Sequence, residues 1–249
     1  DRPDLEPSFL HRYHIVPDRW LAHGAMSTLG GAFGWLNSKI WPELRTFAEL
    51  ERLAQESVPG ANSLLFLPYL AGERSPVWDP EASGAWLGLR LRHTRQDMVR
   101  AVFEGTTFGL RQILDRGMAK WGTRPQSMLG VGGGARSRFW GQMKADVLKL
   151  DYIMSDMPDA SALGAALLGA IAAGAYRNVD DPDLPFARAH TSPIAPGPAR
   201  TLSVYDRLFD LYDKAHPQLC GLMHALADRS SDHYTETEPT PLTRFGSAL

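Results

Sequence analysis

The sequence predicts an α/β fold, in which short apolar strands alternate with amphipathic helices. The apolar run over residues 63–70 has the length of a buried strand, and residues 128–131 and 152–154 form two shorter apolar segments. Residues 94–118 lie between the first two segments and carry apolar side chains at helical spacing. This order of strands and helices is typical of layered α/β proteins.

The first part of the chain is expected to form a hairpin followed by two helices. Residues 9–26 mix apolar and polar side chains in alternation, which predicts a hairpin or two short strands. The next segment, 29–40, has one apolar helical face, and Ser27 or Thr28 is expected to cap it. Pro42 is expected in the first turn of the following helix, where its missing N–H leaves no hydrogen bond unmade.

The middle of the chain is expected to hold a strand, a loop and the longest helix. Residues 63–70 are continuously apolar, as in a strand that is covered on both faces, and Pro68 marks its end. The loop 72–80 is too charged and too rich in proline to belong to the core. Thr94 and Asp97 have the spacing of a capping box and mark the start of the long helix.

The last third is expected to begin with a buried helix over residues 160–175. Gly164 and Gly169 lower its helix propensity by roughly 1 kcal/mol each, so close packing is expected to compensate. The segment is also shorter than the roughly 20 residues that span a bilayer, so we exclude a membrane partner.

The C-terminal part is expected to be less regular. Residues 177–200 form a proline-rich connection, and residues 202–227 predict a final helix that is interrupted near Pro217. Residues 228–249 are polar and predict a disordered tail. We therefore divide the chain into one domain over residues 1–227 and a tail over residues 228–249.

The run 132–137, with the sequence Gly-Gly-Gly-Ala-Arg-Ser, is the strongest indication of a binding site. It follows the apolar segment 128–131 and precedes a segment with helical periodicity. A glycine turn between a strand and a helix exposes backbone N–H groups without Cβ atoms in the way, and the helix dipole favours an anion there. We therefore expect this turn to bind phosphate. The phosphate-loop pattern GxxxxGK[ST] is absent, and the nearest downstream lysine, Lys144, falls within the following helix.

A second nucleotide pattern overlaps the same turn. Gly130, Gly132 and Ala135 satisfy a loose dinucleotide-binding pattern. Asp151 and Asp156 lie near the position of its ribose-binding carboxylate. The residues alone thus favour a nucleotide and leave its identity open.

The composition excludes several classes of protein. The chain has 249 residues, 44% hydrophobic content and a net charge of -2, without a basic stripe, so nucleic acid is excluded as a partner. Its single cysteine, Cys220, cannot form an internal disulfide, which indicates a cytoplasmic setting. His11, His14 and His23 lack thiol or acidic neighbours at metal-binding spacing, so no metal site is assigned. The chain begins with Asp1 rather than Met, which indicates a fragment or a processed piece.

Four blocks of the sequence occur in the order found in one known family. They are residues 67–76 (LPYLAGERSP), 84–89 (GAWLGL) with the following 97–104, 132–137, and 162–166 (ALGAA). Over residues 63–176 the chain resembles the C-terminal domain of the FGGY family of carbohydrate kinases, and within that family it is most similar to the xylulokinases.

The resemblance implies an actin-like, ribonuclease H-like ATPase architecture, of which this chain is the C-terminal lobe. In that architecture two lobes close over ATP and a sugar, and the γ-phosphoryl group passes to a sugar hydroxyl. The resemblance implies that the amides around Gly133, Gly134 and Ala135 hold the nucleotide. It also implies that Gly30 admits the phosphates and that Arg138 lies beside the adenine. ATP with Mg2+ is expected in the complete enzyme, and such amides suit phosphoryl transfer, which depends on positioning and charge stabilisation.

The chain departs from the family pattern at its catalytic end. The family's general base is an aspartate of the N-terminal domain, and its first phosphate-binding hairpin also precedes the residues present here. We therefore assign no catalytic residue, and we expect the chain alone to bind nucleotide weakly, if at all, and to transfer no phosphate. The expected partners are ATP, a small sugar or sugar acid and the N-terminal kinase lobe, while a homodimer is left open.

Other functions stay open at the level of the sequence. The expected substrate is D-xylulose, which is converted to D-xylulose 5-phosphate. Gluconate and ribulose are alternatives within the family, and the tryptophan at position 78 resembles the gluconate kinases. Outside the family, the alternatives are an NAD-binding oxidoreductase domain and a non-enzymatic interaction module. Glu73 and Arg74 are interpreted as a structural pair, and Asp97 and Glu104 as scaffolding.

Overall fold

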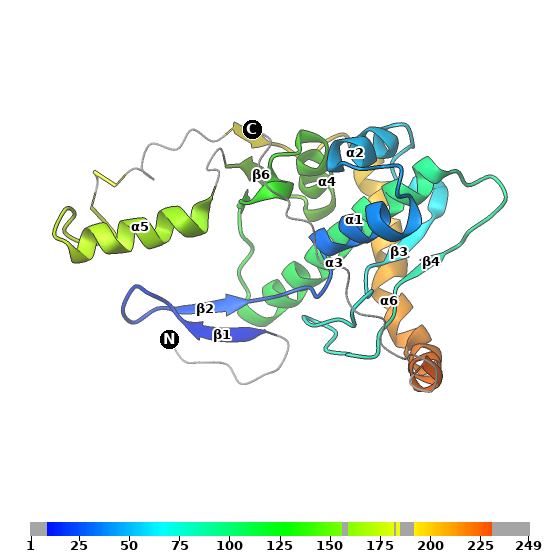
Figure 1. Cartoon of the computed structure of the whole chain (residues 1–249), viewed down its shortest axis with the longest axis horizontal. Coiled ribbons are helices and arrows are strands. Elements are labelled where there is room, and N and C mark those ends of the chain that lie inside the picture. The colour runs from blue at the N-terminus through cyan, green and yellow to red at the C-terminus, as the bar shows by residue number, and fades with distance from the viewer. Residues whose placement is uncertain (1–8, 156–158, 182, 185–191, 231–249) are drawn as a thin grey trace.

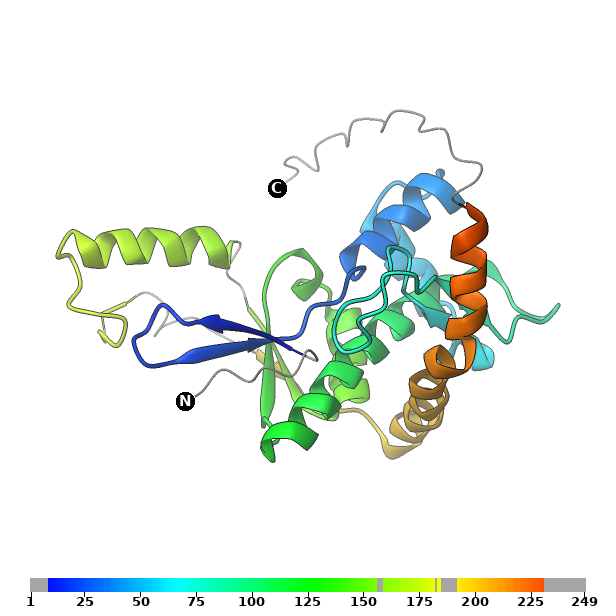
Figure 2. The same ribbon diagram turned by 90° about the horizontal axis from the view of Figure 1, so that it is seen from below.

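The computed structural model describes residues 9–155, 159–181, 183–184 and 192–230, and these form a mixed α/β structure (Figure 1). In chain order the elements are β1 (Leu10–Tyr13), β2 (Trp20–His23), α1 (Gly30–Trp35), the π-helical η1 (Leu36–Ile40), α2 (Phe47–Gln55), the 3₁₀-helical η2 (Ala61–Ser63), β3 (Leu65–Leu67), β4 (Ala85–Leu87), α3 (Arg95–Trp121), β5 (Ser127–Gly130), the 3₁₀-helical η3 (Gly133–Ala135), α4 (Arg138–Leu148), β6 (Asp151–Met154), α5 (Ala160–Ala172), β7 (Ser192–Ile194) and α6 (Ala199–Ser230). A helical body that contains α3 and α6 forms one end of the molecule, and the β1–β2 hairpin and α5 project from the other end (Figures 1 and 2).

The strands form three small sheets rather than one continuous sheet. β1 pairs antiparallel with β2, and β3 pairs antiparallel with β4. β6 is the central strand of the third sheet, parallel to β5 and antiparallel to β7. The hairpin expected over residues 9–26 and the strands expected at 128–131 and 152–154 are confirmed. The strand expected over 63–70 is buried as predicted, but β3 is only three residues long.

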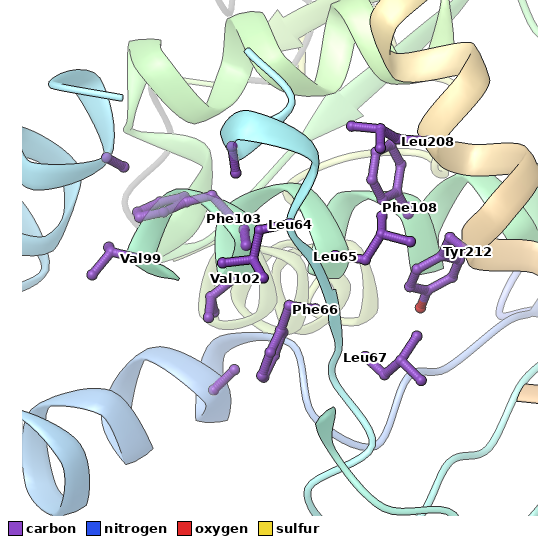
Figure 3. Close-up of a cluster of buried hydrophobic side chains, with 14 of the residues drawn as sticks. Leu64, Leu65, Phe66, Leu67, Val99, Val102, Phe103, Phe108, Leu208 and Tyr212 are labelled. Atoms are coloured by element: carbon purple, nitrogen blue, oxygen red, sulfur yellow. The ribbon is translucent and has the colours of Figure 1, made fainter. Parts of the chain in front are cut away.

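Helix α3 lies at the centre of the largest hydrophobic core. Thr94 and Asp97 form the expected capping box at its start, which confirms the scaffolding role of Asp97, and Gly122, with a φ of 65°, ends it. Figure 3 shows the side chains of β3 gathered with those of α3 and α6. A Cβ at Gly105 would overlap the carbonyl oxygen of Phe66, so α3 can approach β3 this closely only because the position is glycine.

The first two helices begin differently from the sequence prediction. Helix α1 has no side-chain cap, so the cap expected at Ser27 or Thr28 is wrong. Helix α2 begins after Thr46, which forms a capping box with Glu49, and not at Pro42. The capping box satisfies two backbone N–H groups at the helix start, whereas a proline satisfies none, so the box sets the boundary.

A buried ion pair joins α3 to its neighbouring helices. Arg100 Nε lies 2.7 Å from Glu104 Oε1, with side chains that are 7% and 1% exposed. Arg100 also donates to two carbonyl oxygens at the end of α2, those of Ala54 and Ser57. It donates as well to the hydroxyl of Tyr205 on α6. Burial raises the pKa of Glu104, and the charge of Arg100 opposes that rise. This network confirms the scaffolding interpretation of Glu104.

Helix α5 forms where the sequence predicts a helix, but it is not buried. Leu167 is its one buried residue, although the helix consists almost entirely of Ala, Leu, Gly and Ile. A Cβ at Gly164 or Gly169 would meet no atom within 4 Å. The prediction of close packing at these glycines is therefore wrong, because the described residues bring no element against them. No helix in the described part of the chain has the length and apolar character to cross a membrane.

The C-terminal region is more regular than expected. Helix α6 runs through Pro217 without a break, so the predicted interruption is wrong. Tyr212 and Met223, on either side of the proline, are both buried, and this packing holds the two halves of the helix together despite the missing N–H. β7 forms within the connection that was expected to be irregular. Residues 228–230 of the expected tail belong to α6, and residues 231–249 lie outside the described residues.

Candidate functional site

The glycine run forms the predicted turn between a strand and a helix. β5 ends at Gly130, Gly132 has a φ of 85°, and the 3₁₀-helical turn η3 follows. Ser137 then caps α4 by accepting a hydrogen bond from the N–H of Trp140 at 2.9 Å. Two residues therefore separate η3 from α4, and the helix does not open directly at the glycines.

Two backbone amides of this turn have no partner in the described part of the chain. The N–H of Ala135 donates to the carbonyl oxygen of Gly132 at 3.1 Å, and the N–H of Arg136 donates to that of Gly133 at 3.3 Å. These bonds leave the N–H groups of Gly133 and Gly134 at the open start of the turn. Ala135 differs from the two glycines, because its amide closes the turn and the residue is only 3% exposed.

The two glycines with free amides have different surroundings. A Cβ at Gly133 would meet no atom within 4 Å, whereas a Cβ at Gly134 would lie 2.7 Å from Cζ3 of Trp140. Gly133 thus faces open space, and Gly134 packs against the indole ring. A side chain at position 133 would fill the open side of the turn, while one at position 134 would displace Trp140.

Gly30 and Arg138 occupy the first positions of α1 and α4. Both residues are exposed, and a Cβ at Gly30 would meet no atom within 4 Å. The two helices are joined by the rings of Phe33 and Trp140, whose centroids are 5.0 Å apart. Because Trp140 also covers Gly134, this aromatic contact connects the two glycine segments that the sequence assigns to one site.

Lys144 is the residue of this region whose importance the sequence reasoning missed. Its Nζ donates to the carbonyl oxygen of Gly134 at 3.2 Å and to the hydroxyl of Tyr152 at 3.3 Å. The same Nζ lies 3.9 Å from the centroid of the Trp140 ring, and the residue is 6% exposed. Burial lowers the pKa of Lys144 to about 8. A sequence signal existed, since Lys144 follows Trp140 by four positions and therefore shares its buried helical face.

The charged loop that follows β3 is partly buried, so the prediction that it lies outside the core is wrong. Glu73 is 4% exposed, and its Oε1 accepts hydrogen bonds from the N–H groups of Ser27 at 2.7 Å and Arg74 at 2.8 Å. Arg74 Nη2 donates to the carbonyl oxygen of Met26 at 3.0 Å. Burial raises the pKa of Glu73. Backbone donors make the burial of this carboxylate tolerable, and the bonds confirm the structural interpretation of Glu73 and Arg74.

Asp79 joins the same loop to the C-terminal helix through two histidines. Its Oδ2 lies 2.8 Å from Nε2 of His216 and 2.9 Å from Nε2 of His224. Burial alone would raise the pKa of Asp79, but the hydrogen bonds from His224 and His216 hold it below its ordinary value. The sequence carried no signal of this cluster, because both histidines lie more than a hundred residues from Asp79. In the part of the chain that the structure describes, no three or more His, Cys, Asp or Glu side chains are arranged to hold a metal ion.

Comparison with known proteins identifies the family. The chain matches the model of the FGGY family of carbohydrate kinases, C-terminal domain, over residues 2–173. It is 37% identical to the xylulose kinase of Staphylococcus epidermidis over 174 residues, which are 70% of this chain and 35% of that protein. It is 32% identical to the gluconokinase of Bacillus subtilis, over 72% of this chain and 37% of that protein. The solved structure of the ligand-bound xylulose kinase from Lactobacillus acidophilus matches with a TM-score of 0.78 at 27% identity, over 91% of this chain and 45% of that chain.

These matches confirm the fold and exclude the NAD-binding alternative. The chain spans between 35% and 45% of the lengths of the three relatives. Its likeness to FGGY sugar kinases confirms the expected actin-like ATPase fold. The NAD-binding oxidoreductase that Gly130, Gly132 and Ala135 left open is overturned by the family match, and Asp156 lies outside the described residues. The chain therefore belongs to the FGGY family of carbohydrate kinases, and it carries the C-terminal domain of that family.

Proposed function

We propose that this chain supplies the nucleotide-binding lobe of a kinase that phosphorylates a sugar hydroxyl with ATP. In the reaction the hydroxyl oxygen forms a bond to the γ-phosphorus, the bond from that phosphorus to the bridging oxygen breaks, and ADP leaves. The hydroxyl proton passes to a base, which by family resemblance is an aspartate of the N-terminal lobe. The chain alone is therefore proposed to be inactive.

The free amides of Gly133 and Gly134 carry this proposal. They are two adjacent donors at the open start of a turn, and the open space at Gly133 and Gly30 leaves room for phosphate to approach. Ala135 is proposed to act through the shape of the turn, since its own amide is already bonded. Arg138, exposed at the start of α4, is proposed to lie beside the adenine. ATP is proposed to enter as its Mg2+ complex, in which the metal neutralises phosphate charge.

Calorimetric titration of the protein that contains both lobes with a non-hydrolysable ATP analogue tests the turn. Gly133→Val is expected to weaken binding by at least roughly tenfold, about 1.4 kcal/mol, because the added side chain fills the open side of the turn. The fold should persist, since a Cβ at this position meets no atom within 4 Å. Gly164→Val is the matched control, because it also points into open space but lies in α5. Equal affinity of wild-type protein and Gly133→Val would remove the turn from the site.

The sugar is proposed to be D-xylulose, with gluconate as the second candidate. Relatives named as xylulose kinases and as gluconokinases both match this chain, and Trp78, 38% exposed in the loop 72–80, is the feature that favours gluconate. A coupled ADP-release assay on the gene product that contains both lobes decides between them. The highest kcat/KM is expected with D-xylulose, and a higher value with gluconate would reverse the assignment. Absence of turnover and of ATP binding would instead favour the non-enzymatic module.

A homodimer stays open, whereas a cytoplasmic location and the division of the chain at residue 227 stay predictions. Light scattering of the purified protein tests for a homodimer, and limited proteolysis followed by mass spectrometry tests the division at residue 227.

A further inference from the structure

Lys144 is a buried cation directly behind the glycine turn. The residue is 6% exposed, and its Nζ contacts the carbonyl oxygen of Gly134, the hydroxyl of Tyr152 and the ring of Trp140. Desolvation is the cause of its lowered pKa, with no carboxylate among the described residues opposing that effect. An amine without an acidic partner is costly to bury, and a neutral side chain of the same length would fill this space at lower cost.

The contact with Gly134 fixes one peptide unit of the turn. The carbonyl of Gly134 and the N–H of Ala135 belong to the same planar unit and point in opposite directions. Lys144 holds the carbonyl at 3.2 Å, and the carbonyl oxygen of Gly132 holds the N–H at 3.1 Å. Both ends of this unit are therefore anchored, so the unit cannot rotate without breaking a hydrogen bond.

The position of the charge also suits an anion at the other end of the turn. In a 3₁₀-helical turn the carbonyl groups point toward the C-terminal end and the N–H groups toward the start. Lys144 places its positive charge at the carbonyl end, where its Nζ donates to the oxygen of Gly134. The free N–H groups of Gly133 and Gly134 lie at the opposite end.

We infer that Lys144 is a positioning residue for the nucleotide: by holding the carbonyl of Gly134, it keeps the glycine turn in the shape that presents two free amides to phosphate. This inference rests on the proposed function. Lys144 acts through the turn and needs no contact with the nucleotide itself.

Lys144→Met in the kinase that contains both lobes is the direct test. The KM for ATP is expected to rise about tenfold, because a hydrogen bond from a charged group to the turn is lost. The KM for the sugar should stay within about twofold, and the melting temperature should not fall, because a buried charge is removed. Lys214→Met, at an exposed position of α6, is the matched control and should change none of these values.

A pH series separates positioning from packing. As the pH rises above about 8, Lys144 loses its proton, so the KM for ATP of the wild-type enzyme should rise. Lys144→Met should lack this rise. Tyr152 is the titratable group that faces Lys144, and burial raises its pKa, so it stays neutral over this range. Tyr152→Phe should therefore keep the rise but move it to lower pH, because the buried ammonium loses one hydrogen-bond acceptor.

The outcomes of these assays separate a failure of the positioning role from a failure of the proposed function. If the wild-type enzyme saturates with ATP and Lys144→Met has the same KM for ATP, the positioning role is overturned while the proposed function stands. If Lys144→Met lowers the melting temperature and raises both KM values, Lys144 is a packing residue and the inference is overturned as well. A wild-type protein that never saturates with ATP overturns the proposed function, and the role of Lys144 with it.

Discussion

Helices α3 and α5 show that the apolar content of a helix does not decide whether it is buried. Helix α3 buries the charged residues Asp97, Arg100 and Glu104, whereas α5, which is almost purely apolar, buries only Leu167. α3 packs against α2, β3, α4 and α6, while α5 stands apart from the helical body (Figure 1). Charged groups can be buried when hydrogen bonds satisfy them, and apolar groups stay exposed when no other element reaches them.

The glycines of α3 and α5 differ in the same way as the two helices. Gly105 of α3 lets the helix touch the backbone of Phe66, and a Cβ there would overlap that backbone. Gly164 and Gly169 of α5 would each accept a Cβ without contact to any atom within 4 Å. The same residue type therefore serves close packing in one helix and serves no packing in the other.

The largest effect is expected from breaking the buried ion pair of α3. Arg100→Met should lower the free energy of unfolding by about 3 to 5 kcal/mol, because the carboxylate of Glu104 is left buried without its cation. Urea denaturation followed by circular dichroism measures the change. The double variant Arg100→Met with Glu104→Gln should recover part of the loss. A loss below about 1 kcal/mol in the single variant would show that the pair is not what holds α3 in the core.

Lys144 differs from Arg100, because no carboxylate among the described residues pairs with its buried charge. Its pKa falls from 10.5 to about 8 in the folded state, so the unfolded chain binds its proton more tightly. The free energy of unfolding should therefore rise between pH 8 and pH 10.5, by up to about 3 kcal/mol relative to Lys144→Met. Denaturation curves of both proteins at several pH values measure this difference. Parallel pH profiles of the two proteins would show that Lys144 keeps an ordinary pKa.

A smaller loss is expected at the closest contact of α3 with β3. Gly105→Ala should lower the free energy of unfolding by about 2 kcal/mol, because the new methyl group forces the helix away from Phe66. Thermal and urea denaturation measure the effect. An unchanged stability would mean that α3 and β3 are less closely packed than the structure shows.

The smallest effect is expected in α5, and it has the opposite sign. Gly164→Ala should stabilise the helix by at most about 1 kcal/mol, because alanine has the higher helix propensity and its Cβ meets no atom within 4 Å. The helical signal in circular dichroism at increasing temperature measures this gain. A loss of stability instead would reveal that another surface packs against Gly164.

Short-range signals were the most reliable part of the sequence. The capping box of Thr94 and Asp97 and the turn at residues 132–137 depend on hydrogen bonds between residues a few positions apart, and both were predicted. The helix start at Pro42 failed, although the competing pair Thr46 and Glu49 was visible in the sequence and carried the correct boundary.

The candidate site was likewise predicted only in part from the sequence. Gly133 and Gly134 were found from a local pattern, and no described residue accepts a hydrogen bond from their amides. The bond from Lys144 to Gly134 was missed, although the helical spacing from Trp140 placed the lysine on the buried face. Nothing in that spacing shows which carbonyl the amine reaches, because this depends on how η3 folds back over α4.

Local sequence patterns were enough to predict the β1–β2 hairpin, the capped start of α3, the strand–turn–helix at the glycine run and, through ordered motifs, the kinase family. Tertiary packing was needed to establish that α5 is exposed, that Glu73 is buried and that Asp79 contacts two histidines of α6. The two groups of features differ in the distance along the chain over which they are fixed. Caps, turns and helical faces are fixed by neighbours along the chain, whereas burial and long-range hydrogen bonds depend on which distant segments pack together.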